Sequence, residues 1–423
     1  MNVPADQHSS AANTALSSSE PVQPVVAPNS GKKTIRWEWW AYGITLAVIL
    51  AIAVPVSYRY WAQSQRAAFK RQCREAVSRK KWDELLARAQ AWHKWEPRND
   101  DALVFLAQAA AELKQMPLAV ESLGSVSDTY KGALQALAFR AEMQFSDLNR
   151  PFDAEATWLR MIRIQPRADL PRQRLIYFYA LTLQRHKLVA QLEESIRLGC
   201  EPPEAYTYLI MKDTLNFSDG LAQTTRWRLA DPDNEILAAA QAVYAVKQTA
   251  SEMIASFASE TTSADAEALF EKALERYPQN LELLALKLDR AVFEGRTDVV
   301  LSSLKQAPGS AGDDSRFWRF RGWLLSVTQQ PEAAEKALLK AIELNPFDWQ
   351  ARWALADVLR KLQRTAEADG ISRIALEGKL LQAKIFERPN ARDVDEQLIR
   401  AIHAYLQKTA PLWIREAFDQ RVD

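Results

Sequence analysis

Glycine is scarce in this chain, with 12 residues in 423. A low glycine content favours helices over turn-rich β structure. The sequence has no glycine-rich phosphate loop either. Its nearest approach is the pair Gly309 and Gly312, which lies in a Pro-Gly-Ser-Ala-Gly turn without the lysine that such a loop requires. Nucleotide binding of the phosphate-loop type is therefore not expected.

Histidine and cysteine are rarer still, with four and two residues. The histidines are His8, His93, His186 and His403. None has a second histidine or a glutamate at metal-ligand spacing, so we expect no metal and no cofactor. No residue pattern indicates a catalytic triad, and we expect a protein that binds rather than catalyses. Cys73 and Cys200 lie several helices apart, whereas bridged Cα atoms lie within about 7 Å, so no disulfide is expected.

The net charge is also close to zero, because the sequence has 54 Lys and Arg and 53 Asp and Glu. This balance offers no electrostatic case for nucleic acid, and no small-molecule substrate is expected. The chain is longer than one compact core usually covers, which favours either two or three domains or a repeat array.

One long uncharged run is present. The 20 residues from Trp39 to Tyr58 carry no charge, and as a helix they would span about 30 Å, the thickness of a bilayer core. Aromatic residues cluster at both ends, as at membrane interfaces. We predict a transmembrane helix within 37–61, behind a Ser-, Ala- and Pro-rich tail at 1–36 that is too polar to order itself. The alternatives are a cleaved signal peptide and a buried core helix, but no small-x-small cleavage site follows the run.

Two arguments about orientation oppose each other. Three basic residues precede the run and six follow it up to Arg79, which favours the C-terminal side inside. The later residues, however, belong to a long folded segment, which translocates largely regardless of charge. We favour a cytoplasmic N-terminus, with the rest of the chain on the outer side.

A repeat organises the second half of the sequence. Ala334, Leu338 and Ala341 recur 34 residues later as Ala368, Ser372 and Ala375. Steps of the same size backwards lead first to Val300, Leu304 and Ala307, and then to Ala266, Phe270 and Ala273. With Trp318, Gly322 and the closing Pro346, this pattern resembles the tetratricopeptide repeat, a unit of two antiparallel helices.

The resemblance implies an all-α fold, a right-handed α-solenoid of about nine helix pairs. We place it at 62–376, with strict register over 247–376 and capping helices at 377–423. A tail lying in the groove is the alternative for this last segment. The excess residues at 248–263 are interpreted as a tolerated insertion, with a contact loop as the alternative. The residues expected to pack where the helices cross are Trp318, Gly322, Ala334, Ala341, Ala356 and Ala368.

The resemblance also implies a concave groove lined by the first helix of each pair, which holds a protein or peptide. Arginine and tryptophan, favoured at binding hot spots, recur on one helix face there. The predicted groove residues are Arg316, Arg319, Trp323, Trp353, Asp357 and Arg360. The alternative is a solvated charged face with both tryptophans packed sideways. Trp323 and Asp357 depart from the Asn that family members use to grip a C-terminal carboxylate.

The function predicted from these features is a membrane-anchored, non-catalytic scaffold or adaptor that binds protein partners. The alternative is a structural subunit of a membrane-bound complex for secretion or envelope assembly. A solenoid is compatible with both functions, because its repeats stack in order to fold, whether or not they also bind a partner.

Overall fold

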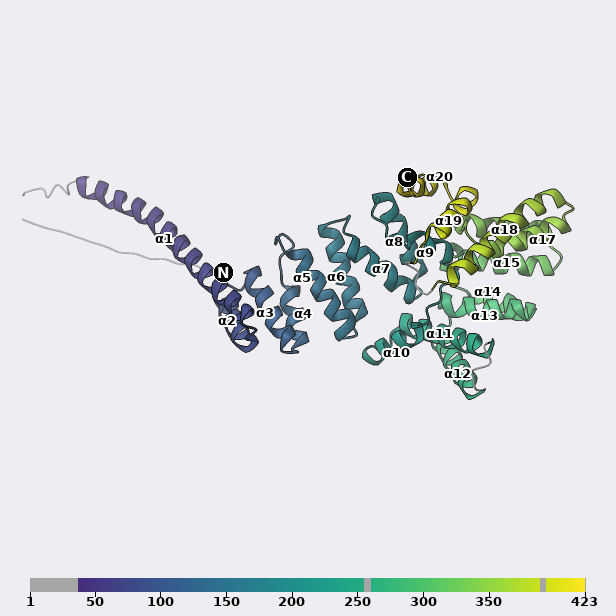
Figure 1. The fold of residues 1–423 in the computed structure, drawn as a ribbon, viewed down its shortest axis with the longest axis horizontal. Coiled ribbons are helices and arrows are strands. Elements are labelled where there is room, and N and C mark those ends of the chain that lie inside the picture. The colour runs from purple at the N-terminus through teal and green to yellow at the C-terminus, as the bar shows by residue number, and fades with distance from the viewer. Residues whose placement is uncertain (1–36, 255–259, 389–392, 423) are drawn as a thin grey trace, which may run out of the picture. The chain divides into compact units, whose positions relative to one another are not determined.

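The computed structural model describes residues 37–254, 260–388 and 393–422. Over these residues the chain forms 20 α-helices, one short π-helical turn and one short 3-10 turn, and no β-strand (Figure 1). The predicted all-α fold is therefore confirmed. The predicted tail at 1–36 and the centre of the predicted insertion lie outside the described residues.

The helices are α1 (Trp37–Ser78), α2 (Trp82–Trp95), α3 (Asp100–Glu112), α4 (Met116–Gly124), α5 (Ala133–Glu142), η1 (Met143–Asp147), α6 (Pro151–Ile164), α7 (Asp169–Leu181), α8 (Arg185–Leu198), α9 (Ala205–Met211), α10 (Gly220–Ala230), α11 (Glu235–Ile254), α12 (Glu260–Arg276), α13 (Leu281–Phe293), α14 (Thr297–Gln306), η2 (Gly309–Asp313), α15 (Ser315–Val327), α16 (Pro331–Leu344), α17 (Trp349–Lys361), α18 (Thr365–Phe386), α19 (Glu396–Thr409) and α20 (Leu412–Val422). In chain order, α1 to α18 are eighteen helices, the number that nine helix pairs require.

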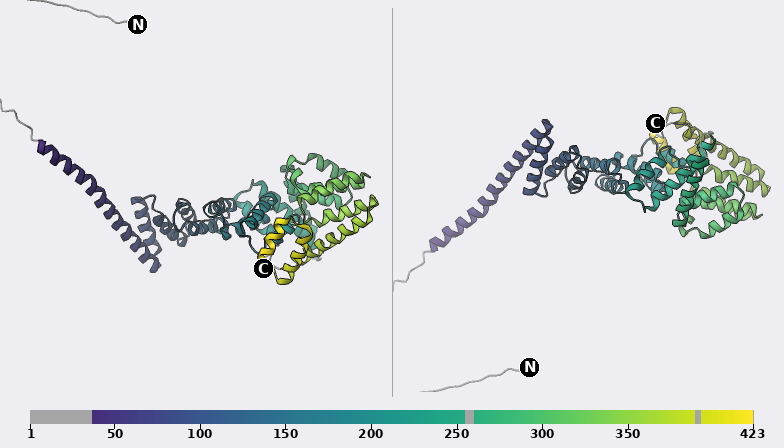
Figure 2. Two further views of the ribbon diagram at one scale, coloured as in Figure 1. Left: turned by 90° about the horizontal axis from the view of Figure 1, so that it is seen from above. Right: turned by 90° about the horizontal axis from the view of Figure 1, so that it is seen from below.

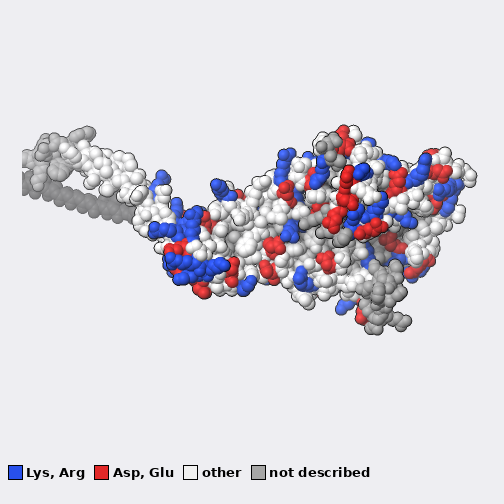
Figure 3. All heavy atoms as spheres, in the orientation of Figure 1, with Lys and Arg blue, Asp and Glu red and all other residues white. Residues whose placement is uncertain are grey.

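The chain divides into two compact units, and the boundary between them falls between Ala67 and Ala68, within α1. In the first unit, the apolar run forms part of α1 and its large side chains are exposed, from Trp40 to Trp61. By length and composition, this helix is able to cross a membrane. Figure 3 shows this part of α1 without Lys, Arg, Asp or Glu, whereas both signs of charge cover the repeats.

In the second unit, the turn inside most helix pairs has one residue in the left-handed conformation, which ends the first helix. These residues are Lys80, Lys114, Asn149, Leu183, Gly295, Gln329 and Gln363, with φ between 52° and 71°. In each of these seven turns, the backbone N–H just after this residue donates to a carbonyl of the preceding helix, as in Gln184 N to Tyr179 O at 2.8 Å. The turns follow one another at 34 or 35 residues on both sides of the gap between Leu183 and Gly295. The spacing of these turns is therefore as regular from α1 to α8 as from α13 to α18.

The predicted packing residues lie at the helix crossings. Gly322, Ala334, Ala341, Ala356 and Ala368 are buried, and Trp318 is half-buried with its indole Nε1 donating to the Gly312 carbonyl at 2.7 Å. A Cβ atom on Gly322 would lie 2.5 Å from Cγ of Leu338, so α15 and α16 approach more closely than any larger residue allows.

The end of the chain returns to the middle of the second unit. The ring of Phe418 in α20 meets that of Tyr206 in α9 edge-on, at 4.6 Å between centroids, and Arg421 pairs with Glu201 at 3.0 Å. Near the end of α9, Thr214 accepts a 2.6 Å hydrogen bond from Gln382 of α18. Figures 1 and 2 show the yellow C-terminal helices beside α8 and α9. The last helices of the described chain therefore contact the region of α8 and α9 as well as α18.

Ala368 provides a matched test of the helix crossings, because Ala366 lies on the exposed side of the same helix. Ala368→Leu should lower the free energy of unfolding by about 1 to 3 kcal/mol, since its site has no room for a larger side chain. Ala366→Leu should change it by less than about 0.5 kcal/mol. Chemical denaturation followed by circular dichroism measures both. Equal effects of the two changes would show that the crossing is assigned to the wrong residues.

Candidate functional site

A buried ionic cluster joins three helices of the second unit that are distant in sequence. The carboxylate of Glu282, at the start of α13, accepts from Arg185 of α8 and from Arg316 of α15, with shortest contacts of 2.8 and 2.7 Å. Arg316 also pairs with Asp314 at 2.6 Å, and Asp314 caps α15 by accepting from the Arg316 N–H. Two cations and two anions therefore neutralise one another inside the fold.

Electrostatics keep this cluster charged. Burial alone would raise the pKa of Glu282, but Arg185 and Arg316 outweigh it and hold that pKa below its usual value. For Asp314, the effect of burial is likewise exceeded by that of Arg316, and its pKa is lowered to about 2. Both carboxylates thus remain ionised at neutral pH. Both arginines are occupied by ion pairs with these carboxylates, so we assign the cluster a structural role.

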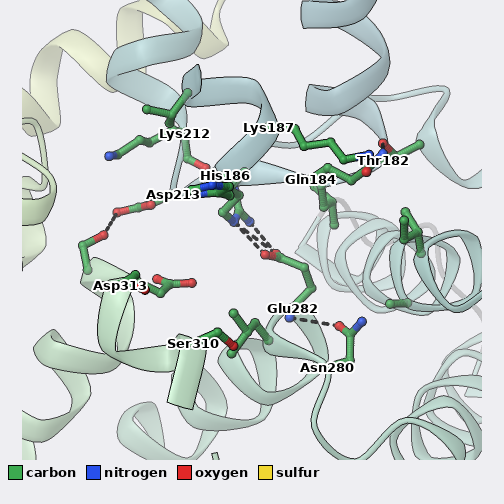
Figure 4. A pocket seen from close by; sticks show the side chains of 18 of the residues that line it. Thr182, Gln184, His186, Lys187, Lys212, Asp213, Asn280, Glu282, Ser310 and Asp313 are labelled. Atoms are coloured by element: carbon green, nitrogen blue, oxygen red, sulfur yellow. Dashed lines mark hydrogen bonds and ion pairs between the residues drawn. The ribbon is translucent and has the colours of Figure 1, made fainter. Parts of the chain in front are cut away.

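A cavity of about 620 Å³ lies directly against this cluster. Its wall is built from helix ends and turns: the turn before α8, the end of α9, the starts of α11 and α13, and η2. In Figure 4, His186, Lys187 and Lys212 lie on one side of the space, with Asp313, Glu282 and Ser310 across from them. Ser315 of α15 and Leu344 of α16 complete the lining, so elements that are distant in the sequence converge here.

The predicted groove residues separate into two groups. Arg316 and Arg319 are buried, Arg316 in the cluster above and Arg319 between Asp348 and Asp289, each at 3.2 Å. Trp323 is half-buried and packs against the main hydrophobic core.

The remaining three residues, all on α17, are exposed. The Trp353 side chain is 46% exposed, and Asp357 accepts from Arg360 at 2.8 Å. Arg360 also donates to Ser372 of α18 at 2.7 Å. A contact role for these side chains remains a prediction.

Sequence reasoning missed the cavity. The signals that mark it are Arg185, His186 and Lys187 in succession, and Glu282 in a first helical turn, but neither signal predicts that α8 meets α13. Within the described ranges, no group of three or more His, Cys, Asp and Glu could hold a metal ion. Cys73 is buried and Cys200 is half-buried, and neither forms a disulfide within the described residues.

Comparison with known proteins identifies one repeat. The family model of the tetratricopeptide repeat matches residues 316–348, which comprise α15, α16 and the turn that follows. No curated protein matches the chain.

Several solved structures are similar over much of their length. The Cut9–Hcn1 hetero-tetramer of APC/C is 13% identical, with 83% of this chain and 73% of that chain covered and a TM-score of 0.31. A tetratricopeptide repeat protein from Parabacteroides merdae is 12% identical over 69% and 98%, with a TM-score of 0.26. Yeast Tom70 is 11% identical over 87% and 92%, with a TM-score of 0.25. Residues 316–348 therefore match one repeat of the tetratricopeptide family, in a chain whose described residues are helical throughout and contain no strand.

Proposed function

We propose that this chain is a membrane-anchored, non-catalytic scaffold that binds protein partners. The observation that carries the proposal is the exposed apolar run of α1, in a chain that is otherwise built from helical repeats. Large apolar side chains such as Ile44, Leu50 and Ile52 are more than half exposed. Removing apolar surface from water is worth about 25 cal/mol per Å², so a bilayer is the environment that relieves this exposure.

Aromatic residues support the position of the membrane boundary. The rings of Tyr58 and Trp61 lie 5.9 Å apart at the end of the apolar run, and Tyr60 between them is exposed. Amphipathic rings prefer the headgroup level of a bilayer. Charged residues begin again at Arg59, which agrees with a span that ends there.

The partner surface that we propose is centred on Trp353. Tryptophan is over-represented among residues that dominate binding energy, and Trp353 is the predicted groove tryptophan that no hydrophobic core cluster includes. Asp357 and Arg360 flank it as the polar rim. Arg316 and Arg319 are not part of this surface, because their charges are paired with carboxylates of this chain.

The anchor is tested by alkaline carbonate extraction. The full chain should stay in the membrane pellet, because the span is stabilised by burial in lipid. Replacing both Leu50 and Ile52 by Arg should release much of it, since each arginine at the centre of a span costs about 2.5 to 3.5 kcal/mol. Exposed Leu412 to Arg, in α20, is the control and should have no effect. A wild-type chain found in the supernatant would contradict the anchor.

For topology, we propose that the repeats lie on the outer side of the membrane. A protease added to sealed, right-side-out vesicles should then digest the segment after residue 68 without detergent. Western blotting with tags at both ends reads the result. Digestion only after detergent treatment would place the repeats inside.

The partner surface is tested by comparing two tryptophans. Trp353→Ala should leave the melting temperature almost unchanged and weaken partner capture by about 1 kcal/mol or more, about fivefold. Trp323→Ala should instead lower the melting temperature, because Trp323 packs against the core. Affinity capture from solubilised membranes, with quantitative mass spectrometry, measures binding.

The same capture separates two roles. Several substoichiometric partners, reduced together by Trp353→Ala, support a scaffold. One stoichiometric complex would favour the structural subunit instead. Capture that is identical for wild type and Trp353→Ala would remove this surface from the proposal.

A further inference from the structure

We propose that the cavity beside the Glu282 cluster binds a lysine or arginine side chain from a segment of a partner protein. The proposal rests on the proposed function, since the occupant is part of a protein. It assigns that partner a chemistry and a second place of contact, away from Trp353.

The cavity has the dimensions of a binding site. Its volume of about 620 Å³ falls in the range of about 300 to 1,000 Å³ that ligand pockets occupy. Its apolar lining suits the aliphatic stem of a long basic side chain, which buries its methylenes and keeps its charge near polar groups. The apolar residues of the lining include Leu183, Ile236, Ala239, Leu281 and Leu344.

Most cations around the cavity are already paired. Arg185 and Arg316 are bound by Glu282 and Asp314. Lys187 pairs with Glu155, which is not part of the lining, at 2.8 Å. These pairs leave no net positive charge for an anionic ligand, although three basic residues follow one another at the start of α8.

Three carboxylates of the lining, in contrast, form no ion pair with a cation among the described residues. Asp213 accepts from Ser315 and Asn345 through Oδ2, and Glu235 accepts from Asn280 at 2.9 Å through Oε1. These donors are neutral and leave the second oxygen of each carboxylate available. Asp313 is exposed, and among the described residues it has no hydrogen bond or ion pair.

Lys212 is the remaining lining lysine, and its Nζ donates to the carbonyl of Leu344 at 3.1 Å. Arg319, whose charge also acts on Asp213, is bound by Asp348 and Asp289. Three carboxylates without a cation partner therefore border the cavity, together with one ammonium group without an anion partner. The excess of negative charge favours a cationic occupant, and opposite charges attract more strongly in a partly enclosed site than in open water.

The side chains are placed for such an occupant. Figure 4 shows Asp313 on the η2 side of the space and Asp213 on the α9 side, on separate elements that border the cavity. A basic side chain that enters between them would meet carboxylate oxygens from two directions. A guanidinium or ammonium group bound in this way forms charge-assisted hydrogen bonds, the stronger class of such bonds.

The experiment uses the full chain in detergent and four sets of acetylated, amidated hexapeptides. Each set is random except at its third position, which is fixed as Lys, Arg, Glu or Leu. Pull-down with mass spectrometry measures retention. Wild type should retain the Lys and Arg sets at least fivefold more than the Glu and Leu sets. The double variant Glu235→Gln and Asp313→Asn should lose this preference.

The matched control changes two exposed carboxylates outside the cavity, Asp298→Asn and Glu332→Gln. It removes the same charge and should keep the preference. Circular dichroism checks that all variants are folded. Equal retention of the four sets by wild type would overturn the proposal, and so would a preference that survives in the Glu235 and Asp313 variant.

Two further outcomes separate this inference from the proposed function. Isothermal titration with spermidine and with lysine amide tests for a small-amine site. If spermidine or lysine amide binds as tightly as the best peptide, the occupant is not a protein segment, and the proposal is wrong. Partner capture from membranes that is unchanged in the Glu235 and Asp313 variant would overturn the cavity proposal alone. Loss of capture only on Trp353→Ala would then leave the scaffold intact.

Discussion

The interaction on which the second unit depends is the buried carboxylate of Glu282, held between Arg185 and Arg316. Taking such charges out of water costs several kcal/mol each, and only close pairing offsets that cost. The cluster therefore specifies an arrangement more than it adds stability, because any displacement of α8, α13 or α15 leaves a buried charge without a partner. Removing one member would typically cost about 3 to 5 kcal/mol.

This constraint explains why a repeat array encloses a cavity. In a simple solenoid each pair contacts only its neighbours. Here α8 meets α13 through Arg185 and Glu282. The chain just after α9 meets α15, α16 and α18 through Asp213, Lys212 and Thr214. Helix ends then line a common space, and helix ends carry the polar groups that helices leave unsatisfied.

The local part of the fold could be predicted from the sequence. Period, small residues at crossings and the number of pairs follow from spacing, because each helix must bury one apolar stripe against its neighbour. The left-handed turns follow the same register. They use residues such as Lys114 and Gln363 instead of glycine, which explains why glycine is scarce although the turn recurs.

The return of the chain on itself could not be predicted, since a period carries no information about contacts between distant pairs. Arg316 is the clearest example. Its position in the helix indicates an exposed groove face, yet its side chain is buried against Glu282 of α13, which also binds Arg185 of α8. Trp353 has a similar sequence setting and stays exposed, because it lies on α17, away from that closure. The burial of Arg316 thus depends on Arg185 and Glu282, which lie far away in the sequence.

Charged and apolar groups that have a partner within the chain serve the fold, whereas groups without one are available to another molecule. Arg316, Glu282 and Asp314 are charged and satisfy one another, so their burial needs no ligand. The apolar face of α1 and the carboxylate of Asp313 have no such partner among the described residues. Exposed apolar surface is relieved by lipid and uncompensated charge by a counter-charge, and these are different environments. The proposed membrane anchor and the proposed basic partner would therefore satisfy different groups of the chain.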